Sequence, residues 1–201
     1  SDKTGDIDML TLVKQYIKEK YNKPGNVYLG LVHRLDRPVG GIMIFAKTSK
    51  AASRLSDQVR EKVFKKKYLA VVDGKIENKS GTLEDYLYKD ERNNISKVVN
   101  KGKKNAKFAK LDYDVIKYDE VKNLSLVKVN LHTGRHHQIR VQLSNFGHSI
   151  FGDQKYGTRG QGKQIALWAY ELTINHPITK EEMTFKDLPE SVGTWCILRN
   201  R

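Results

Sequence analysis

The chain has 201 residues, with 37 Lys and Arg against 23 Asp and Glu, which gives a formal net charge of +14. This length is enough to bury a sizeable core in one domain. The excess positive charge favours a polyanionic partner, because cationic side chains release counterions when they bind one. The alternative is a basic protein with no nucleic-acid role. No apolar run approaches the roughly 20 residues that a membrane-spanning helix needs, and no signal-like apolar segment opens the chain.

Cysteine usage and histidine spacing both argue against a metal site. Cys196 is the single cysteine, so an intrachain disulfide and a cysteine-based metal cluster are excluded. A zinc site made of His132, His136 and His137 is disfavoured, because Gly134 interrupts the possible pair and no carboxylate lies between to act as a base. The cysteine usage fits a reducing compartment, and we expect a cytoplasmic protein. No protein partner is implied, so we expect a monomer.

The first third of the chain predicts two helices and two strands. Apolar residues recur at helical spacing over residues 9–17, after acidic residues that suit a helix start. Residues 28–32 predict a strand, and the wholly apolar run 42–46 predicts a buried strand. Thr48 or Ser49 can then cap the second helix.

The rest of the chain predicts mostly strands. Residues 76–105 are polar and rich in Lys, Asn and Gly, so they predict hairpins or mobile loops. Strands are expected at 67–73, 109–115, 124–131, 165–174 and 183–185. Strands outnumber helices and several neighbours are expected to pair antiparallel. The predicted fold class is therefore α+β, with a mixed, largely antiparallel sheet flanked by helices and loops.

Asp36 lies between two arginines, Arg34 and Arg37, in a segment without helical periodicity. Pro38 and the Gly40-Gly41 pair impose an irregular backbone, and functional side chains are often carried on such loops. Nearby positive charge favours the ionised form of a carboxylate, and arginine is the side chain best matched to phosphate. In a basic chain, this combination points to chemistry on a nucleic acid. The alternative is an aspartate that caps a turn and pairs with a surface arginine.

A second polar cluster runs from Thr133 to Arg140. If a helix begins near Arg135, with Thr133 as its cap, His136 and His137 share a face with Arg140. The free N–H groups at the start of such a helix can receive a phosphate.

Two further segments carry weaker signals. Tyr68 follows three consecutive lysines; it can stack on a base, because every base has a π-face, or simply pack in a strand. Residues 151–157 form a glycine-bracketed loop, and a turn closed by Asp153 is its ordinary explanation.

Taken in chain order, these segments resemble the RluA family of pseudouridine synthases. The resemblance covers roughly residues 29–190. The matching motifs are His33-Arg34-Leu35-Asp36, Phe45-Ala46-Lys47, Lys67-Tyr68-Leu69-Ala70, Thr133-Gly134-Arg135-His136-His137-Gln138-Ile139-Arg140, Gly152-Asp153, Tyr156-Gly157 and His176-Pro177. Each motif alone is moderately specific, whereas the ordered set is highly specific.

The resemblance implies isomerisation of uridine in structured RNA to pseudouridine, without a metal or organic cofactor. Ribosomal RNA is the favoured target and transfer RNA the next. Asp36 matches the family's catalytic aspartate, Tyr68 its active-site tyrosine, and Arg140 the basic residue paired with the aspartate. The residues expected to bind RNA or organise the pocket are Arg34, Arg37, His33, Arg135 and His137.

The chain also departs from the family pattern. Gly40 stands where members commonly have Ser, and Gln142 stands where many have His, which is expected to alter RNA contacts. We expect residues 1–201 to form a single catalytic domain that lacks the family's usual N-terminal strand and any RNA-binding domain of the S4 type.

Two other functions compete with the synthase. A non-catalytic RNA-binding factor would not require the trio of Asp36, Tyr68 and Arg140. A base-releasing glycosidase would usually need paired carboxylates, and Asp36 has no obvious acidic partner among the motifs.

Overall fold

The computed structural model describes residues 7–160 and 163–199, and these residues fall into two compact units. The first unit holds the described residues up to 34 together with 43–64 and 174–183. The second holds 35–42, 65–173 and the described residues from 184 onward. The single catalytic domain expected over residues 1–201 stays a prediction.

Two capped helices and a short pair of strands make up most of the first unit. Its elements are α1 (Met9–Lys20), β1 (Gly30–Leu31), β3 (Phe45–Ala46) and α2 (Ser49–Arg60). The carboxylate of Asp8 accepts the N–H of Thr11 at 2.9 Å, and the hydroxyl of Thr48 accepts the N–H of Ala51 at 3.1 Å. These contacts satisfy amides that the first helical turn leaves unpaired. Both predicted helices are confirmed, including the cap at Thr48.

The two strands predicted at 28–32 and 42–46 are wrong in extent. Only β1 and β3 form a ladder there, with two residues each. The backbone between them bonds elsewhere: the N–H of Ile44 is donated to Nε2 of His33 at 2.9 Å, within the same unit. An apolar run alone does not reveal such partners, so the sequence overestimates the strands.

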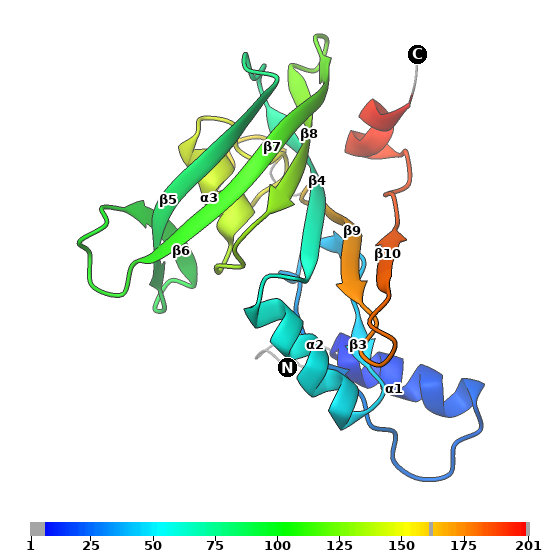
Figure 1. The fold of residues 1–201 in the computed structure, drawn as a ribbon. Helices are drawn as coiled ribbons and strands as arrows, with labels where there is room; N and C mark the ends of the chain where they lie inside the picture. Colours follow the sequence, from blue (N-terminus) through cyan, green and yellow to red (C-terminus); the bar gives the residue numbers. More distant parts are fainter. Residues whose placement is uncertain (1–6, 161–162, 200–201) are drawn as a thin grey trace. The chain divides into compact units, whose positions relative to one another are not determined.

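The second unit is built on a mixed sheet (Figure 1). In the described part of the chain this sheet has eight strands, in the order β10-β9-β4-β8-β7-β5-β6, with β2 added beside β9. The strands are β2 (Gly40–Gly41), β4 (Lys65–Asp73), β5 (Ser80–Asp90), β6 (Ile95–Val99), β7 (Lys107–Asp119), β8 (Leu124–Leu131), β9 (Leu167–Asn175) and β10 (Glu182–Lys186). The β2–β9 pair is parallel, whereas β4, β5, β7 and β8 pair antiparallel with their neighbours. The predicted α+β class is confirmed.

Period-two patterns placed most of these strands well. The alternation over residues 109–115 lies inside β7, and the run predicted at 124–131 is β8, its antiparallel neighbour. The polar segment 76–105 contains the β5–β6 hairpin. The bounds of the strands predicted at 165–174 and 183–185 differ by one or two residues from those of β9 and β10.

Helix α3 (Gln138–Asn145) lies on one face of the strands β5, β7 and β8 (Figure 1). Leu143 of this helix, Leu111 of β7 and Val127 of β8 are fully buried in one core cluster. Burying each such side chain contributes about 1.5–3 kcal/mol. The core therefore fixes α3 against the sheet, and with it the residues that α3 carries. A 3₁₀ helix, η1 (Gly193–Leu198), follows β10 and adds Ile197 to the same core.

The start of α3 differs from the prediction by three residues. Instead of capping a helix at Arg135, the hydroxyl of Thr133 accepts the N–H of Lys110 at 2.9 Å and donates to Gln138 at 2.7 Å. The side-chain oxygen of Gln138 also accepts the N–H of Arg135 at 3.0 Å. Because this turn uses those groups, the helix begins only at Gln138, with His137 at its N-cap position. His136 and His137 therefore do not share a helical face with Arg140.

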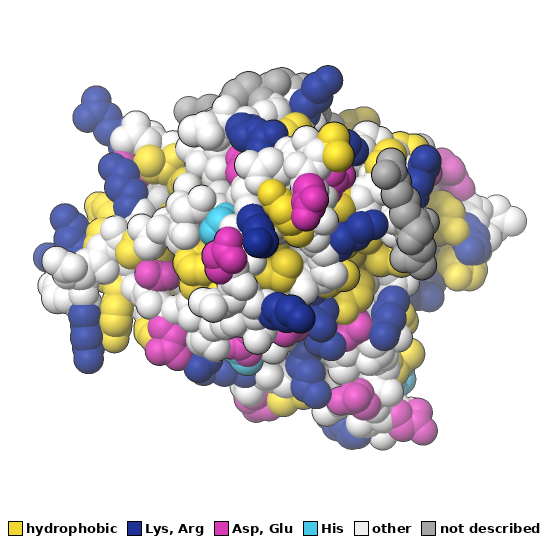
Figure 2. Space-filling view, turned by 90° about the horizontal axis from the view of Figure 1, so that it is seen from above, with side chains coloured by type: hydrophobic (Ala, Val, Ile, Leu, Met, Phe, Trp, Pro, Cys, Tyr) yellow, Lys and Arg dark blue, Asp and Glu magenta, His cyan; other side chains and the backbone are white. Residues whose placement is uncertain are grey.

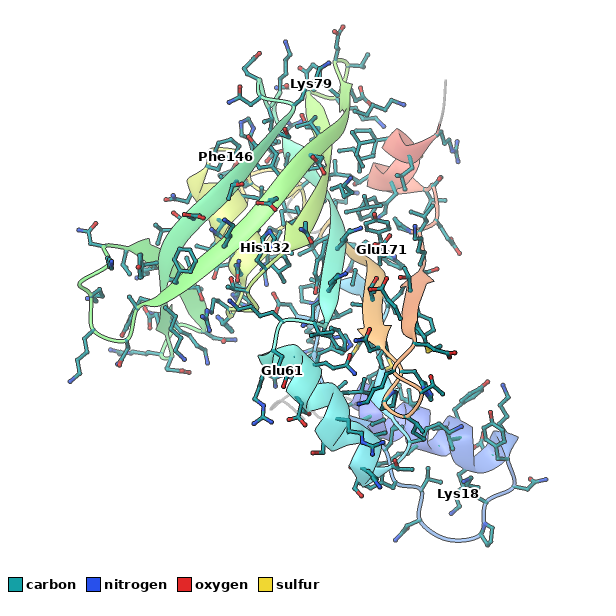
Figure 3. The ribbon with its side chains drawn as sticks, viewed as in Figure 1. Lys18, Glu61, Lys79, His132, Phe146 and Glu171 are labelled. Atoms are coloured by element: carbon teal, nitrogen blue, oxygen red, sulfur yellow. The ribbon has the colours of Figure 1, made fainter. Side chains whose placement is uncertain are left out.

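Glu171 ties β9 to both of its neighbours (Figure 3). Its buried carboxylate forms ion pairs with Nζ of Lys67 in β4 at 2.6 Å and with Nζ of Lys186 in β10 at 3.2 Å. The two lysines leave this carboxylate compensated within the sheet.

Among the described residues, none of the helices combines the length and apolar character that spanning a membrane would require.

Candidate active site

Asp36 lies in a loop that is fixed through the backbone. The N–H of Val39 donates to the carbonyl of Asp36 at 2.8 Å, and the N–H of Ile42 donates to the carbonyl of Ala169 in β9 at 2.9 Å. Gly41 has φ +114°, and a Cβ there would overlap the backbone of Ala169. Glycine is therefore required at this close approach. The sheet holds the loop in place, and the Asp36 carboxylate remains partly exposed.

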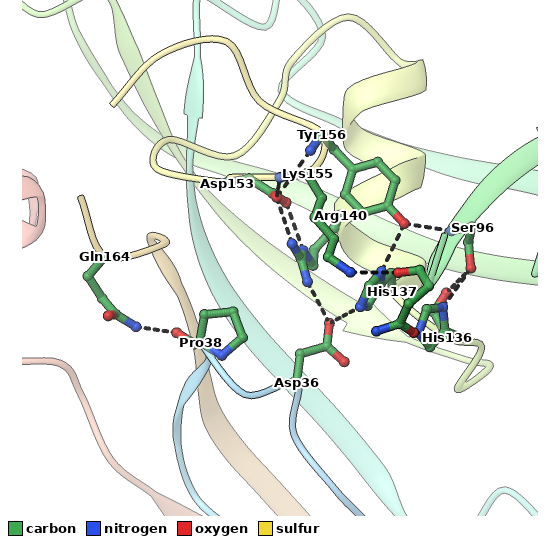
Figure 4. Close-up of polar contacts among 11 residues, drawn as sticks. Asp36, Pro38, Ser96, His136, His137, Arg140, Asp153, Lys155, Tyr156 and Gln164 are labelled. Carbon is green, nitrogen blue, oxygen red and sulfur yellow. Dashed lines mark hydrogen bonds and ion pairs between the residues drawn. The ribbon is translucent and has the colours of Figure 1, made fainter. Parts of the chain in front are cut away.

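Arg140 faces Asp36 from the first turn of α3 (Figure 4). Its Nη1 donates to Oδ2 of Asp36 at 3.3 Å. Its Nε and Nη2 donate to the two oxygens of Asp153 at 2.8 and 2.7 Å, a bidentate pair. Only 4% of the Arg140 side chain is exposed, against 30% for Asp36. A charge-assisted bidentate pair fixes the plane of a guanidinium, so Asp153 aims the remaining nitrogen at Asp36.

Asp153 is fully buried and its hydrogen bonds are satisfied. Oδ1 also accepts the N–H of Lys155 at 2.9 Å and that of Tyr156 at 3.2 Å. Burial alone would raise the pKa of Asp153, but the hydrogen bonds from Arg140 and these amides outweigh it and lower the pKa below 3.8. Asp153 is therefore an anion at neutral pH.

His137 presents its ring to the same carboxylate oxygen. Its Nε2 lies 3.8 Å from Oδ2 of Asp36, and its Nδ1 lies 2.9 Å from the hydroxyl of Tyr156. The residue has φ 52°, in the left-handed region that is uncommon outside glycine. Burial lowers the pKa of His137 to about 4, against the opposing effect of Asp36. The imidazole is therefore neutral at neutral pH.

The β5–β6 hairpin closes the network on the far side of His137 (Figure 4). The backbone N–H of Ser96 donates to the hydroxyl of Tyr156 at 2.6 Å, and its hydroxyl donates to the carbonyl of His136 at 2.7 Å. His136 stacks on His137 with ring centroids 3.7 Å apart. The hairpin thus holds both the tyrosine and the histidine pair.

Tyr68 lies in β4 with 7% of its surface exposed, among the core residues of the second unit. Burial raises the pKa of Tyr68, and the negative charge of Asp36 raises it further. The phenol therefore keeps its proton at neutral pH. Its hydroxyl makes no hydrogen bond with any residue in 7–160 or 163–199.

The residues expected to contact RNA are placed differently from one another. Arg37 and Arg135 are exposed, and Nε of Arg135 donates to the carbonyl of Phe108 at 2.8 Å. His33 and Arg34 belong to the first unit, where Arg34 is exposed and His33 is buried against Phe64. The predicted roles of all five residues, including His137, stay predictions.

Sequence reasoning gave no role to Asp153, Tyr156 or Ser96. Asp153 and Tyr156 lie in the glycine-bracketed loop, whose local pattern predicts a turn and whose family resemblance assigns them no individual role. The charge of Arg140 could have indicated Asp153, because an arginine that is buried on a helix needs a negatively charged partner. Ser96 gave no comparable signal, because its contribution is partly a backbone N–H.

The two departures from the family pattern have structural counterparts. A Cβ at Gly40 would overlap the ring of Trp168, its partner across the β2–β9 ladder. Gln142 is fully buried and donates to Asp85 at 2.7 Å. The expectation that Gln142 alters RNA contacts stays a prediction; because this side chain lies in the interior, any such effect would act through the residues it bonds.

On one face of the molecule, charge alone does not mark out a binding surface. On the face shown in Figure 2, Lys and Arg side chains are scattered among acidic and apolar side chains instead of forming one continuous patch. Within the residues that the structure describes, no group of three or more His, Cys, Asp or Glu side chains is arranged to hold a metal ion. The site is therefore best characterised by the network around Asp36.

Comparison with models of known protein families identifies the family of this chain. The sequence model described as RNA pseudouridylate synthase matches residues 4–145, more than half of the chain and including Asp36, Tyr68 and Arg140. The chain belongs to the RNA pseudouridylate synthase family. Its relatives include proteins named ribosomal large subunit pseudouridine synthase C and tRNA pseudouridine synthase C, which confirms the resemblance to the RluA family.

Similarity to individual proteins also supports membership of this synthase family. The chain is 37% identical over 153 residues to an uncharacterized RNA pseudouridine synthase, YhcT, of Bacillus subtilis, covering 75% of this chain and 49% of that protein. It is 33% identical over 171 residues to tRNA pseudouridine synthase C of Haemophilus influenzae, covering 76% and 71%. The chain thus spans about half the length of the first of these relatives.

A solved structure supports the fold alone. The structure titled human RNA pseudouridylate synthase domain containing 1 matches with a TM-score of 0.76 at 24% identity, covering 92% of this chain and 77% of that one. The backbone arrangement is therefore that of the pseudouridine synthase fold.

Proposed function

We propose that this protein is an RNA pseudouridine synthase that isomerises uridine in structured RNA, with Asp36 as the catalytic carboxylate. The observation that carries the proposal is the ion pair between partly exposed Asp36 and buried Arg140, whose guanidinium is oriented by Asp153. Family membership supplies the reaction, and this arrangement supplies a carboxylate suited to it.

The reaction exchanges one bond to the sugar for another. The bond from C1′ to N1 of uracil breaks, the base rotates, and C1′ bonds to C5; the proton on C5 is lost and N1 gains one. Breaking the glycosidic bond leaves positive character on the sugar and negative charge on uracil. An ionised carboxylate can stabilise the sugar, abstract a sugar proton or attack covalently. No organic cofactor or metal enters this scheme.

Arg140 and Tyr68 support Asp36 in different ways. Arginine stays protonated at any physiological pH, so Arg140 orients the carboxylate and does not take its proton. The ring of Tyr68 is proposed to lie against uracil and to keep the detached base in the pocket. Its hydroxyl is protonated and is influenced by the charge of Asp36, so it can take the C5 proton only while passing its own proton to another base such as Asp36.

Access to the base requires that the uridine leave its stack, as in other enzymes that modify bases. The proposed RNA contacts are made by Arg34, Arg37, His33, Arg135 and His137. Exposed Arg37 follows Asp36 directly and is suited to a backbone phosphate. We propose ribosomal RNA as the first substrate to test and transfer RNA as the second, since relatives are named ribosomal large subunit pseudouridine synthase C and tRNA pseudouridine synthase C. A cytoplasmic monomer stays the expectation.

The decisive experiment compares pseudouridine maps of total RNA from cells with and without the gene, followed by assays of the purified chain on the RNA identified. We expect Asp36→Asn and Asp36→Ala to abolish pseudouridine formation while RNA binding persists. The matched control is Asp114→Asn, which removes an exposed carboxylate paired with Lys128 on the same sheet. Turnover by Asp36→Asn at the wild-type rate would disprove the assignment.

A further inference from the structure

The hydroxyl of Tyr156 makes two hydrogen bonds whose directions can be assigned by counting protons. The backbone N–H of Ser96, which can only donate, lies 2.6 Å from the oxygen. Nδ1 of His137 lies 2.9 Å away and can donate or accept. Burial raises the pKa of Tyr156, so the hydroxyl keeps its single proton at neutral pH.

That proton has one acceptor. Among the described residues, Nδ1 of His137 is the one acceptor that is hydrogen-bonded to the Tyr156 hydroxyl. If Nδ1 carried a proton instead, the tyrosine oxygen would receive two donors and its own proton would have no acceptor among the described residues. The hydrogen-bond count therefore places the hydroxyl proton on the line from Tyr156 to Nδ1.

A neutral imidazole that accepts at Nδ1 carries its proton on Nε2. Nε2 is the atom that lies 3.8 Å from Oδ2 of Asp36, the oxygen that Arg140 also approaches. This separation is longer than a direct hydrogen bond. A donor at Nε2 therefore reaches the carboxylate only if Asp36 moves slightly during the reaction.

We propose that Tyr156 is a positioning residue that fixes His137 as a neutral imidazole with its proton on Nε2, and that this N–H is the second donor directed at Asp36. The inference rests on the proposed function and assigns His137 a task in the catalytic site besides the expected contact with RNA. A neutral donor orients the carboxylate without adding a second full positive charge beside it, so Asp36 keeps its basicity and nucleophilicity.

The surroundings of the ring are consistent with a neutral donor. The charged and titratable groups that act on His137 are Asp36, Arg140, His136 and Lys155, together with the hydroxyl of Tyr156. Three of the four are basic and only Asp36 favours protonation. Stacking of His136 on His137 further disfavours a cationic pair.

The left-handed backbone at His137 allows two explanations to be separated by substitution. Asparagine adopts positive φ readily and places its amide near the position of Nδ1. Glutamine tolerates positive φ less well but places its amide near the position of Nε2. If His137 serves mainly the backbone turn, His137→Asn should be the better variant; if it serves as the Nε2 donor, His137→Gln should be better.

The test combines nuclear magnetic resonance with kinetics on the full chain. In protein labelled with ¹⁵N-histidine, the signals of His137 are identified as those that disappear in the His137→Gln variant. We expect these signals to show a neutral ring that is protonated on Nε2 at pH 7. We expect kcat of His137→Gln to exceed that of His137→Asn by about tenfold or more, and Tyr156→Phe to shift the Nδ1 signal and lower kcat. Tyr118→Phe, which removes an exposed hydroxyl bonded to Asn123, is the control and should change neither.

Three results would overturn the inference: a ring protonated on Nδ1, a His137→Asn variant at least as active as His137→Gln, or wild-type kcat in Tyr156→Phe. An inactive wild-type chain would contradict the proposed function, whereas the ¹⁵N spectrum of free protein would still decide the proton position. The two failures are therefore distinguishable.

Discussion

Asp153→Asn removes the charge that holds Arg140 while keeping the shape of the side chain. The amide oxygen can still accept the N–H groups of Lys155 and Tyr156, but its NH₂ group then meets a guanidinium N–H, donor against donor. Asp153 is 1% exposed and the Arg140 side chain 4%, so solvent cannot replace the lost partner. Removing one partner from a buried ion pair costs about 3–5 kcal/mol. We expect the free energy of unfolding at pH 7 to fall by that amount.

The direction of the Asp153 pKa shift determines how the loss of stability in Asp153→Asn depends on pH. Because the pKa of Asp153 is lowered from 3.8 in the folded protein, its stabilisation is fully present above pH 3.8 and is lost as the pH falls through the lowered pKa. The difference between wild type and Asp153→Asn should therefore shrink below about pH 3.8. Turnover should also fall, by up to about a hundredfold, because Arg140 no longer holds its direction toward Asp36.

Urea unfolding at pH 7 and pH 3, together with single-turnover assays, measures both effects. The control Asp114→Asn breaks an exposed pair with Lys128 and should cost less than about 1 kcal/mol. Adding Arg140→Met to Asp153→Asn removes the uncompensated charge, so the double variant should be more stable than the sum of the single changes. Equal stability of wild type and Asp153→Asn at pH 7 would refute the reasoning.

Three other expectations follow from the site. Gly40→Ser should lower the free energy of unfolding by about 1–3 kcal/mol through overlap with Trp168, and Trp168→Leu should recover part of it; additive costs in the double variant would contradict the contact. Tyr68→Phe should keep its unfolding midpoint, because the ring still fills the core, while turnover falls about a hundredfold; undiminished turnover would exclude the hydroxyl from proton transfer. RNA affinity should fall steeply with salt, and Arg37→Ala should reduce the slope of log affinity against log salt by about one; an unchanged slope would remove Arg37 from the phosphate contacts.

The sequence predicted elements best where one local pattern decides the outcome. β7 and β8 have a clear alternation and a polar turn between them, and the structure pairs them as expected. The approach of Arg140 to Asp36 spans 104 positions along the chain. That pairing came from family resemblance, because spacing along the sequence carries no information about it.

The misses have physical causes that spacing does not record. The late start of α3 depends on a hydroxyl and an amide that bond to β7 and to each other. The anchoring of Arg140 by Asp153 depends on how the loop after α3 folds back over 13 positions. Ser96 contacts Tyr156 through its backbone N–H, so its residue type does not predict that it belongs to the site.

The docking of the Asp36 loop on β9 has a consequence for how such enzymes diversify. The loop is held by peptide groups, through Ile42 and Ala169, and by the absence of a side chain at Gly41. Few side chains of the loop are needed for this attachment, so an exposed position such as Arg37 can change without displacing the carboxylate. The backbone thereby fixes the position of the carboxylate, whereas exposed side chains beside it can be substituted independently of that position.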